Sequence, residues 1–177
     1  MSRLTRKSRA SNLFVRADKQ DERGKKRSAF RLMLAAAKLG DTGAQTNVGN
    51  YYADGNGVRR NRSAALYWYK RAYRRGDYCA ANNIGVLWRD EKKLQRALSW
   101  FLRAVKLGDD EANLEIGKHY LHNKNNPRKA VPCFKQVMQS DWVSEAGAEE
   151  AARLLREAEK LLEARRHRSR SVAIDKS

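Results

Sequence analysis

The side chains that could do chemistry are few, and their spacing matches no catalytic or metal-binding pattern. His119 and His122 lie three residues apart, but no cysteine or carboxylate stands beside them at the spacing of a zinc site. Cys79 and Cys133 have no CxxC spacing and no histidine near them in sequence, which favours packing roles. The motifs GxSxG, HExxH, GxxxxGK and Ser-x-x-Lys are absent. We therefore expect no enzyme activity, no metal and no cofactor, and we interpret both histidines as surface residues.

The charge of the chain indicates an anionic environment or partner. Its 177 residues include 38 Lys plus Arg and 20 Asp plus Glu, which gives a net charge of +18. Residues 1–28 hold 10 basic and 3 acidic groups, residues 59–76 hold 7 basic groups and no acid, and residues 109–162 hold 8 basic and 10 acidic groups. A membrane-spanning helix is excluded, because no apolar run reaches about 18 residues.

A basic ridge is predicted within residues 59–76, off the apolar stripe of a helix and interleaved with tyrosines. Such a ridge can bind the phosphates of nucleic acid or another anionic surface. Two other interpretations stay open, namely a site for acidic protein partners and the solvated helix face of a basic protein. The residues of the ridge are Lys70, Arg71, Arg74 and Arg75.

Internal repeats organise the chain. The segments GDTGAQTNVGNYY, GDYCAANNIGVLW and GDDEANLEIGKHY start at Gly40, Gly76 and Gly108, with spacings of 36 and 32 residues. Between and around them lie four blocks with apolar residues at i, i+3, i+4 and i+7, which predict second helices that must pack against a neighbour. Glycines in the middle of the first helices predict close helix crossings, because glycine destabilises a helix interior by about 1 kcal/mol relative to alanine. These glycines are Gly49, Gly85 and Gly117.

The segment from Ala44 to Gly76 resembles a Sel1-like repeat. The matching positions are Ala44, Val48 with Gly49, Tyr52, Gly55, Gly57 with Val58, Ala65, Trp68 with Tyr69, Ala72 and Gly76. The next two units lack the Gly-x-Gly loop and resemble the related tetratricopeptide repeat. The resemblance covers roughly residues 12–140 and implies an all-α fold, a right-handed α-solenoid of about four antiparallel helix pairs that usually holds other proteins together.

The resemblance also implies that the first helix of each unit lines a concave, partner-binding face. A site for acidic C-terminal tails is excluded, because Thr46, Glu111 and Glu115 stand where such a site needs cations. Each remaining candidate could also be an ordinary packed or solvated position. The candidates are Thr46, Asn50, Asn82, Asn83, Val86, Arg89, Leu114 and Lys118.

The repeat domain is expected over residues 12–143, with residues 13–23 as a degenerate first helix and residues 144–166 as a capping helix. Residues 1–11 and 167–177 lack periodicity and are expected to be flexible tails. The basic N-terminus is similar to a mitochondrial presequence and lacks the apolar core of a secretory signal; we expect a cytoplasmic location. The expected protein is a monomeric, non-catalytic scaffold or adaptor that binds a peptide or protein on its concave face, and the alternative is a binder of nucleic acid or an anionic surface through the ridge.

Overall fold

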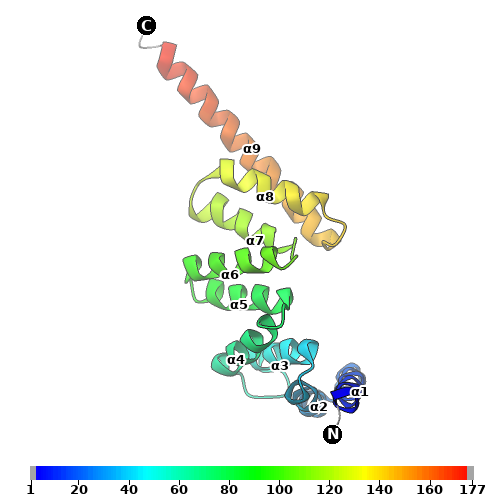
Figure 1. Cartoon of the computed structure of the whole chain (residues 1–177). Helices are drawn as coiled ribbons and strands as arrows, with labels where there is room; N and C mark the ends of the chain where they lie inside the picture. The colour runs from blue at the N-terminus through cyan, green and yellow to red at the C-terminus, as the bar shows by residue number, and fades with distance from the viewer. Residues whose placement is uncertain (1–2, 175–177) are drawn as a thin grey trace. The chain divides into compact units, whose positions relative to one another are not determined.

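Helices are the only regular secondary structure among the residues that the structure describes (Figure 1). The computed structural model describes the backbone of residues 3–174 and the side chains of residues 5–168. It divides into two units, Met1–Glu91 and Lys92–Ser177. The first unit contains α1 (Arg3–Glu22), α2 (Lys26–Leu39), α3 (Thr42–Asp54), α4 (Arg62–Tyr73) and α5 (Tyr78–Asp90). The second contains α6 (Leu94–Lys106), α7 (Ala112–Lys118), the π-helix η1 (His119–Asn123), α8 (Pro127–Gln139) and α9 (Glu145–Ile174).

A glycine followed by an aspartate separates each repeat from the next. Gly40 ends α2 with a φ of 98°, a left-handed conformation that glycine adopts without strain. The carboxylate of Asp41 then accepts a hydrogen bond of 2.8 Å from the backbone N–H of Ala44 and caps α3. The same arrangement recurs at Gly76–Asp77 and Gly108–Asp109. The repeat boundaries predicted from the sequence are therefore helix boundaries.

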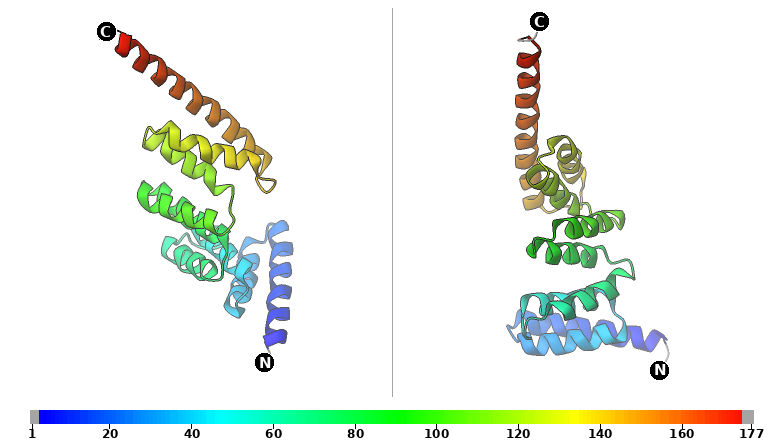
Figure 2. Two further views of the ribbon diagram at one scale, coloured as in Figure 1. Left: turned by 45° about the horizontal axis from the view of Figure 1, so that its top comes forward. Right: turned by 90° about the vertical axis from the view of Figure 1, so that its left-hand side faces the viewer.

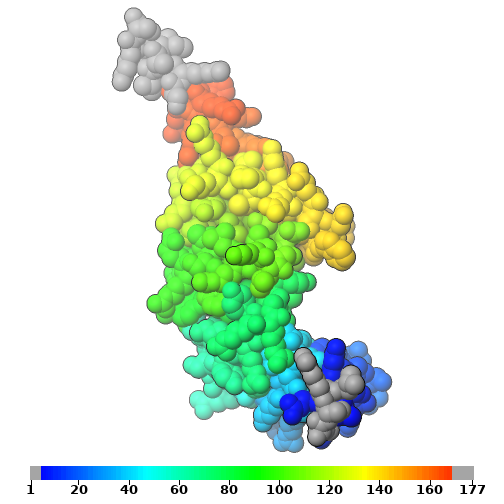
Figure 3. Space-filling view, in the orientation of Figure 1, coloured from blue at the N-terminus to red at the C-terminus, as the bar shows by residue number. Residues whose placement is uncertain are grey.

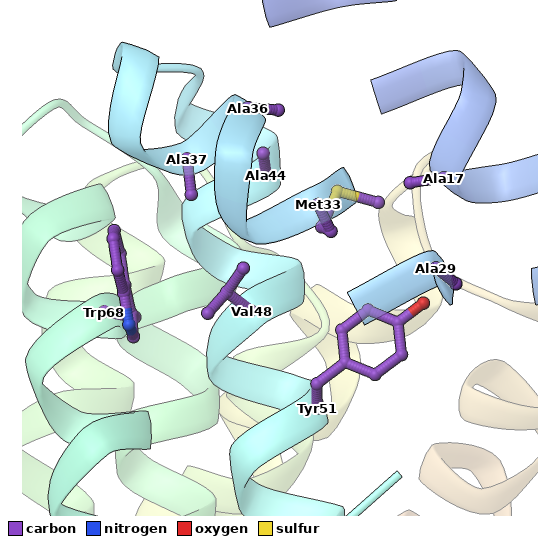
Figure 4. Close-up of a cluster of buried hydrophobic side chains, with 9 residues drawn as sticks. All are labelled: Ala17, Ala29, Met33, Ala36, Ala37, Ala44, Val48, Tyr51 and Trp68. Atoms are coloured by element: carbon purple, nitrogen blue, oxygen red, sulfur yellow. The ribbon is translucent and has the colours of Figure 1, made fainter. Parts of the chain in front are cut away.

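In the first unit α1 packs against α2 and α3 packs against α4 (Figure 2). The core between them combines small and large side chains. Alanines let the helices approach closely, and larger side chains fill the space that they leave (Figure 4). Ala17 is fully buried in this core, which confirms that α1 takes the place of a first helix in the repeat pattern. The cluster consists of Ala17, Ala29, Met33, Ala36, Ala37, Ala44, Val48, Tyr51 and Trp68.

Two of the three predicted helix crossings are confirmed. A Cβ atom added at Gly49 of α3 would overlap the ring of Tyr69 on α4. In the second unit, a Cβ atom added at Gly117 of α7 would overlap the ring of Phe134 on α8. The corresponding role of Gly85 stays a prediction. Each confirmed glycine thus makes room for the aromatic ring of the second helix in its own repeat.

The second unit ends in the predicted capping helix. The first part of α9 lies against α8, and the rest of α9 extends beyond it (Figure 1). In the space-filling view, the orange residues of α9 project past the yellow ones of α8 (Figure 3). Leu154 and Ala158 of α9 are buried with Phe134 and Val137 of α8. This arrangement covers the apolar face of the last helix pair, as solenoids require at their ends.

Both predicted tails are wrong in the part that the structure describes. In the predicted tail 1–11, α1 already begins at Arg3, and Ala10 is buried. In the predicted tail 167–177, α9 continues to Ile174, because no glycine or proline follows Gly147 to end it. Residues 1–2 and 175–177 lie outside the described residues. Among the helices described here, none is both long and apolar enough to cross a membrane.

Candidate partner-binding face

The candidate site is the face of the first unit that is formed by the first helices α1, α3 and α5, here called the first-helix face. The side-chain amide of Asn83 on α5 donates a hydrogen bond of 3.0 Å to Oδ1 of Asn50 on α3. The hydroxyl of Tyr69 on α4 donates to the same oxygen at 2.7 Å. Asn50 and Asn83, both predicted as partner-binding residues, therefore also connect one repeat with the next.

A pocket of about 220 Å³ lies on this face between α1 and α3. The hydroxyl of Tyr51 on α3 donates a hydrogen bond of 2.9 Å to Asp21 on α1, which joins the two walls of the pocket. Carboxylates and amides make up most of the lining, so the pocket can accept hydrogen bonds from cationic or amide groups. The lining residues are Asp18, Asp21, Met33, Asn47, Asn50, Tyr51, Asp54 and Asn56.

The carboxylates of α1 differ in their electrostatic surroundings. The pKa of Asp21 is lowered, chiefly by a 2.7 Å hydrogen bond from Lys26 and also by the hydrogen bond from Tyr51. The pKa of Asp18 is raised by burial and by the negative charges of Glu22 and Asp21. Burial and the bond to Asp21 raise the pKa of Tyr51 far above its usual value, so its hydroxyl stays protonated and remains a donor. The carboxylate of Asp21 therefore stays ionised, and its charge is paired with Lys26.

Two of the predicted partner-binding side chains are buried, so the prediction is wrong at these positions. Thr46 is 6% exposed and donates a hydrogen bond of 3.0 Å to Asp77, the residue that caps α5. Leu114 is also 6% exposed and belongs to the core cluster that contains Leu154 of α9. The repeat pattern alone does not show that a capping helix covers this part of α7.

Lys118 of α7 forms an ion pair with the same capping helix. Its ammonium group lies 3.1 Å from Glu115 and 2.9 Å from Glu150 on α9. Of the two predicted binding residues on α7, Leu114 is thus buried in the core of the second unit and Lys118 is paired with α9. We therefore restrict the candidate site to the first unit.

The three other predicted residues lie on α5 and are half-buried. The Oδ1 atom of Asn82 is buried and has no hydrogen-bond partner among the described residues. Arg89 lies 3.4 Å from the carboxylate of Asp90. Val86 is the apolar member of this group.

Of the predicted basic ridge, Lys70 and Arg71 lie on α4, and Arg74 and Arg75 lie in the turn that follows it. Arg71 donates a hydrogen bond of 3.3 Å to the hydroxyl of Tyr67, and the guanidinium group of Arg75 donates to the carbonyl oxygen of Gly40. Two of the four cations are thus engaged within the first unit. The exposed members with no such bond among the described residues are Lys70 and Arg74.

The interpretation of both histidines as surface residues is wrong for His119. This residue begins η1, is 6% exposed, and has a pKa lowered by burial and by the charge of Lys124. His122 is exposed and lies 3.3 Å from Glu157. Among the described side chains, no three His, Cys, Asp or Glu residues gather in a group that could hold a metal ion.

The sequence analysis missed most of the pocket, although its residues follow a readable pattern. Asn47, Asn50 and Asp54 are spaced i, i+3 and i+7, which places them on one face of α3. Asp18 and Asp21 are spaced i and i+3 on α1 in the same way. A search for polar stripes on the first helices, in addition to apolar ones, could have found the pocket.

Comparison with known proteins finds repeats of a known family in this chain. The Sel1 repeat family matches residues 22–41, 42–77 and 80–109. The chitin synthase regulator SKT5 of Saccharomyces cerevisiae is 28% identical over 134 residues, which cover 72% of this chain and 18% of that protein. The component HRD3B of an ERAD-associated E3 ubiquitin-protein ligase in Arabidopsis thaliana is 29% identical over 101 residues, which cover 56% of this chain and 16% of that protein. The chain therefore spans less than a fifth of the length of these two relatives.

Solved structures show the same fold. A Sel1 repeat protein from Oxalobacter formigenes matches with a TM-score of 0.66 and 23% identity over 84% of this chain and 63% of that one. A protective antigen of uropathogenic Escherichia coli, described as an SLR fold, matches with a TM-score of 0.58 and 15% identity over 85% of this chain and 38% of that one. The expected fold class, an all-α solenoid of helix pairs, is confirmed. The chain therefore contains Sel1 repeats within residues 22–109.

Proposed function

We propose that this protein is a non-catalytic scaffold that binds a protein or peptide partner on the first-helix face of its first unit. The observation that carries the proposal is the pocket between α1 and α3, which is lined by hydrogen-bonding side chains from two different repeats. Sel1 repeat proteins are in general scaffolds for protein interactions, and the relatives named above are a regulator and a ligase component. A partner side chain with a cationic or amide group suits the carboxylates and amides of the lining.

The geometry of the face supports a preformed site. The hydrogen bonds of Asn50 to Tyr69 and Asn83 hold α3 against α4 and α5, and the bond of Tyr51 to Asp21 holds α3 against α1. A partner that binds here meets side chains that are already ordered. Less conformational entropy is then lost on binding than at a mobile surface.

Site-specific photo-crosslinking tests this proposal. A benzophenone amino acid replaces Asn47 in the pocket in one version of the full chain, and it replaces the exposed Ser63 on α4 in a matched control. We expect the Asn47 version to capture a discrete protein in an extract of the native host, and this protein should then bind the purified unlabelled chain. The proposal fails if the protein captured from Ser63 is the same and is captured as strongly.

A further inference from the structure

A cleft of about 460 Å³ between α1 and α2 is lined by four cationic side chains and, among the described residues, by no carboxylate. The two helices lie side by side in the first unit (Figures 1 and 2). Gln20, Ser28 and Leu32 complete the lining. The residues that carry the charge, here called the basic cleft, are Arg16, Lys19, Arg23 and Arg31.

The charge of the basic cleft is not neutralised within the described part of the protein. None of its four cations forms a hydrogen bond or an ion pair with another described side chain, whereas Lys26, close by on α2, lies 2.7 Å from Asp21. Like charges in one cleft repel each other and destabilise the fold, and a cleft lined by one sign of charge concentrates the electrostatic field. The fold itself therefore does not explain why these cations are together.

Helix α1 separates its charges onto two faces. Arg16 and Lys19 are spaced i and i+3 on one face of α1, toward the cleft, and Arg23 follows in the turn after the helix. Asp18 and Asp21 lie on another face and line the pocket between α1 and α3. One helix thus contributes to two surfaces of opposite charge. The positive surface shares no residue with the ridge that the sequence predicted.

We infer that the basic cleft binds an acidic segment of a protein partner. Guanidinium groups bind carboxylates through paired, charge-assisted hydrogen bonds, and three of the four cations are arginines. Leu32 offers an apolar contact, and Ser28 and Gln20 offer hydrogen bonds, which suits a peptide that carries mixed side chains. This inference rests on the proposed function, since it names the chemistry of the partner at a second surface.

The lining of the cleft favours a peptide over nucleic acid. Proteins that hold single-stranded nucleic acid combine a positive groove with aromatic rings on which the bases stack. No aromatic side chain in the described part of the protein lines the basic cleft. A nucleic acid would therefore find only phosphate contacts here, whereas a peptide finds partners for its carboxylates, its backbone and its apolar side chains.

Binding of defined peptides to the full chain tests the inference by fluorescence anisotropy at about 0.15 M salt, where distant surface charges are screened. The probes are a short labelled peptide in which every second residue is glutamate, the same peptide with glutamine, and a single-stranded RNA of equal length. The cleft variant combines Arg16→Gln, Arg23→Gln and Arg31→Gln. The control variant removes the same number of charges from exposed positions elsewhere in the unit, outside the predicted ridge, through Lys38→Gln, Arg59→Gln and Arg60→Gln.

We expect the glutamate peptide to bind the wild-type chain at least about tenfold more tightly than the glutamine peptide does. The cleft variant should lose about tenfold or more of this affinity, and the control variant less than about twofold. The cleft variant should also melt no lower than the wild-type chain, because its substitutions relieve repulsion among unpaired cations.

Three results would overturn the inference: no preference for glutamate over glutamine, equal loss in both variants, or tighter binding of the RNA that is lost in the cleft variant. The first would mean that the cleft is no carboxylate site, the second that only net charge matters, and the third that the ligand is a nucleic acid. Failure here leaves the proposed function standing if the Asn47 crosslink still captures a partner, because that capture does not use the cleft.

Discussion

The smallest residues set the packing of the repeats. Gly49 lies in the middle of α3, where its missing side chain leaves room for the ring of Tyr69. That ring in turn reaches Asn50 through its hydroxyl. One glycine therefore permits both the helix crossing and a hydrogen bond on the first-helix face.

Replacement of this glycine by alanine should destabilise the protein although alanine favours helices. Gly49→Ala forces the ring of Tyr69 to move, and we expect a loss of about 1–3 kcal/mol in the free energy of unfolding. Gly43→Ala in the same helix is the matched control, because an added Cβ there meets Phe14 at an ordinary contact distance of 3.4 Å. This control should be neutral or stabilising by up to about 1 kcal/mol. Urea unfolding followed by circular dichroism measures both, and equal stability of the two variants would contradict the packing described here.

His119 should make stability depend on pH. Burial lowers its pKa in the folded state below the unfolded value, so the unfolded chain binds more protons as the pH falls through that range. The contribution of neutral His119 to stability is then complete above an unfolded pKa of about 6.5 and is lost below it. We expect the melting temperature of the wild-type chain to fall more between about pH 7.5 and pH 5.5 than that of His119→Phe. If the melting temperatures of the two proteins fall equally with pH, His119 is not the source of the pH dependence.

The positions that sequence analysis assigned wrongly are those whose surroundings come from distant segments. Thr46 occupies a surface position in the pattern of α3, but Asp77, which is 31 residues away, accepts its hydrogen bond. Leu114 is likewise buried in a cluster that includes residues of α8 and α9. The repeat pattern describes one repeat and its immediate neighbours, so it does not reveal contacts of this kind.

At the scale of the elements, the sequence predicted the helix boundaries inside the repeats and missed those at the ends. Gly40 and Asp41 form a local signal, because the glycine ends one helix and the aspartate caps the next. No such signal marks the start of α1 at Arg3. The change from α7 to the π-helix η1 at His119 also has no local signal that we can identify.

Disruption of the Gly–Asp junction before α5 should destabilise the protein through both a helix cap and a contact between helices. Asp77 accepts the backbone N–H of Ala80 at 2.9 Å and the hydroxyl of Thr46 at 3.0 Å, so it both caps α5 and ties it to α3. We expect Asp77→Ala to reduce the free energy of unfolding by about 1–2 kcal/mol, measured by chemical denaturation. Asp77→Asn, which can still accept the capping bond, should keep most of the stability. A large loss in both variants would assign the effect to charge and contradict a capping role.

At the scale of the whole molecule, the capping helix should be required over its first part only. Residues Ala151, Leu154 and Ala158 of α9 are buried in the core of the second unit, whereas residues 163–168 are exposed. Removal of residues 144–177 should expose the cluster around Phe134, lower the melting temperature and reduce solubility. Removal of residues 168–177 should leave both unchanged. A shorter chain without residues 144–177 that stays as stable and soluble as the full one would contradict the capping role.

The position of α9 also restricts the candidate partner-binding surface to the first unit. Because Leu114 is buried and Lys118 is paired with α9, the predicted partner-binding residues that stay candidates lie in the first unit. That unit has an acidic pocket and a basic cleft on different faces of α1. Two chemically distinct surfaces on one unit suit a scaffold that holds a partner by more than one contact.

The affinity of the captured partner for pocket variants tests the central claim, that the first-helix face is the binding surface. Asn47→Arg places a long cationic side chain in the pocket, and Ser63→Arg makes the same change at an exposed position of α4. The proposal predicts that Asn47→Arg weakens binding of the partner by at least about tenfold and that Ser63→Arg leaves it unchanged. Unchanged affinity in Asn47→Arg, in a chain that melts at the wild-type temperature, would contradict the proposal.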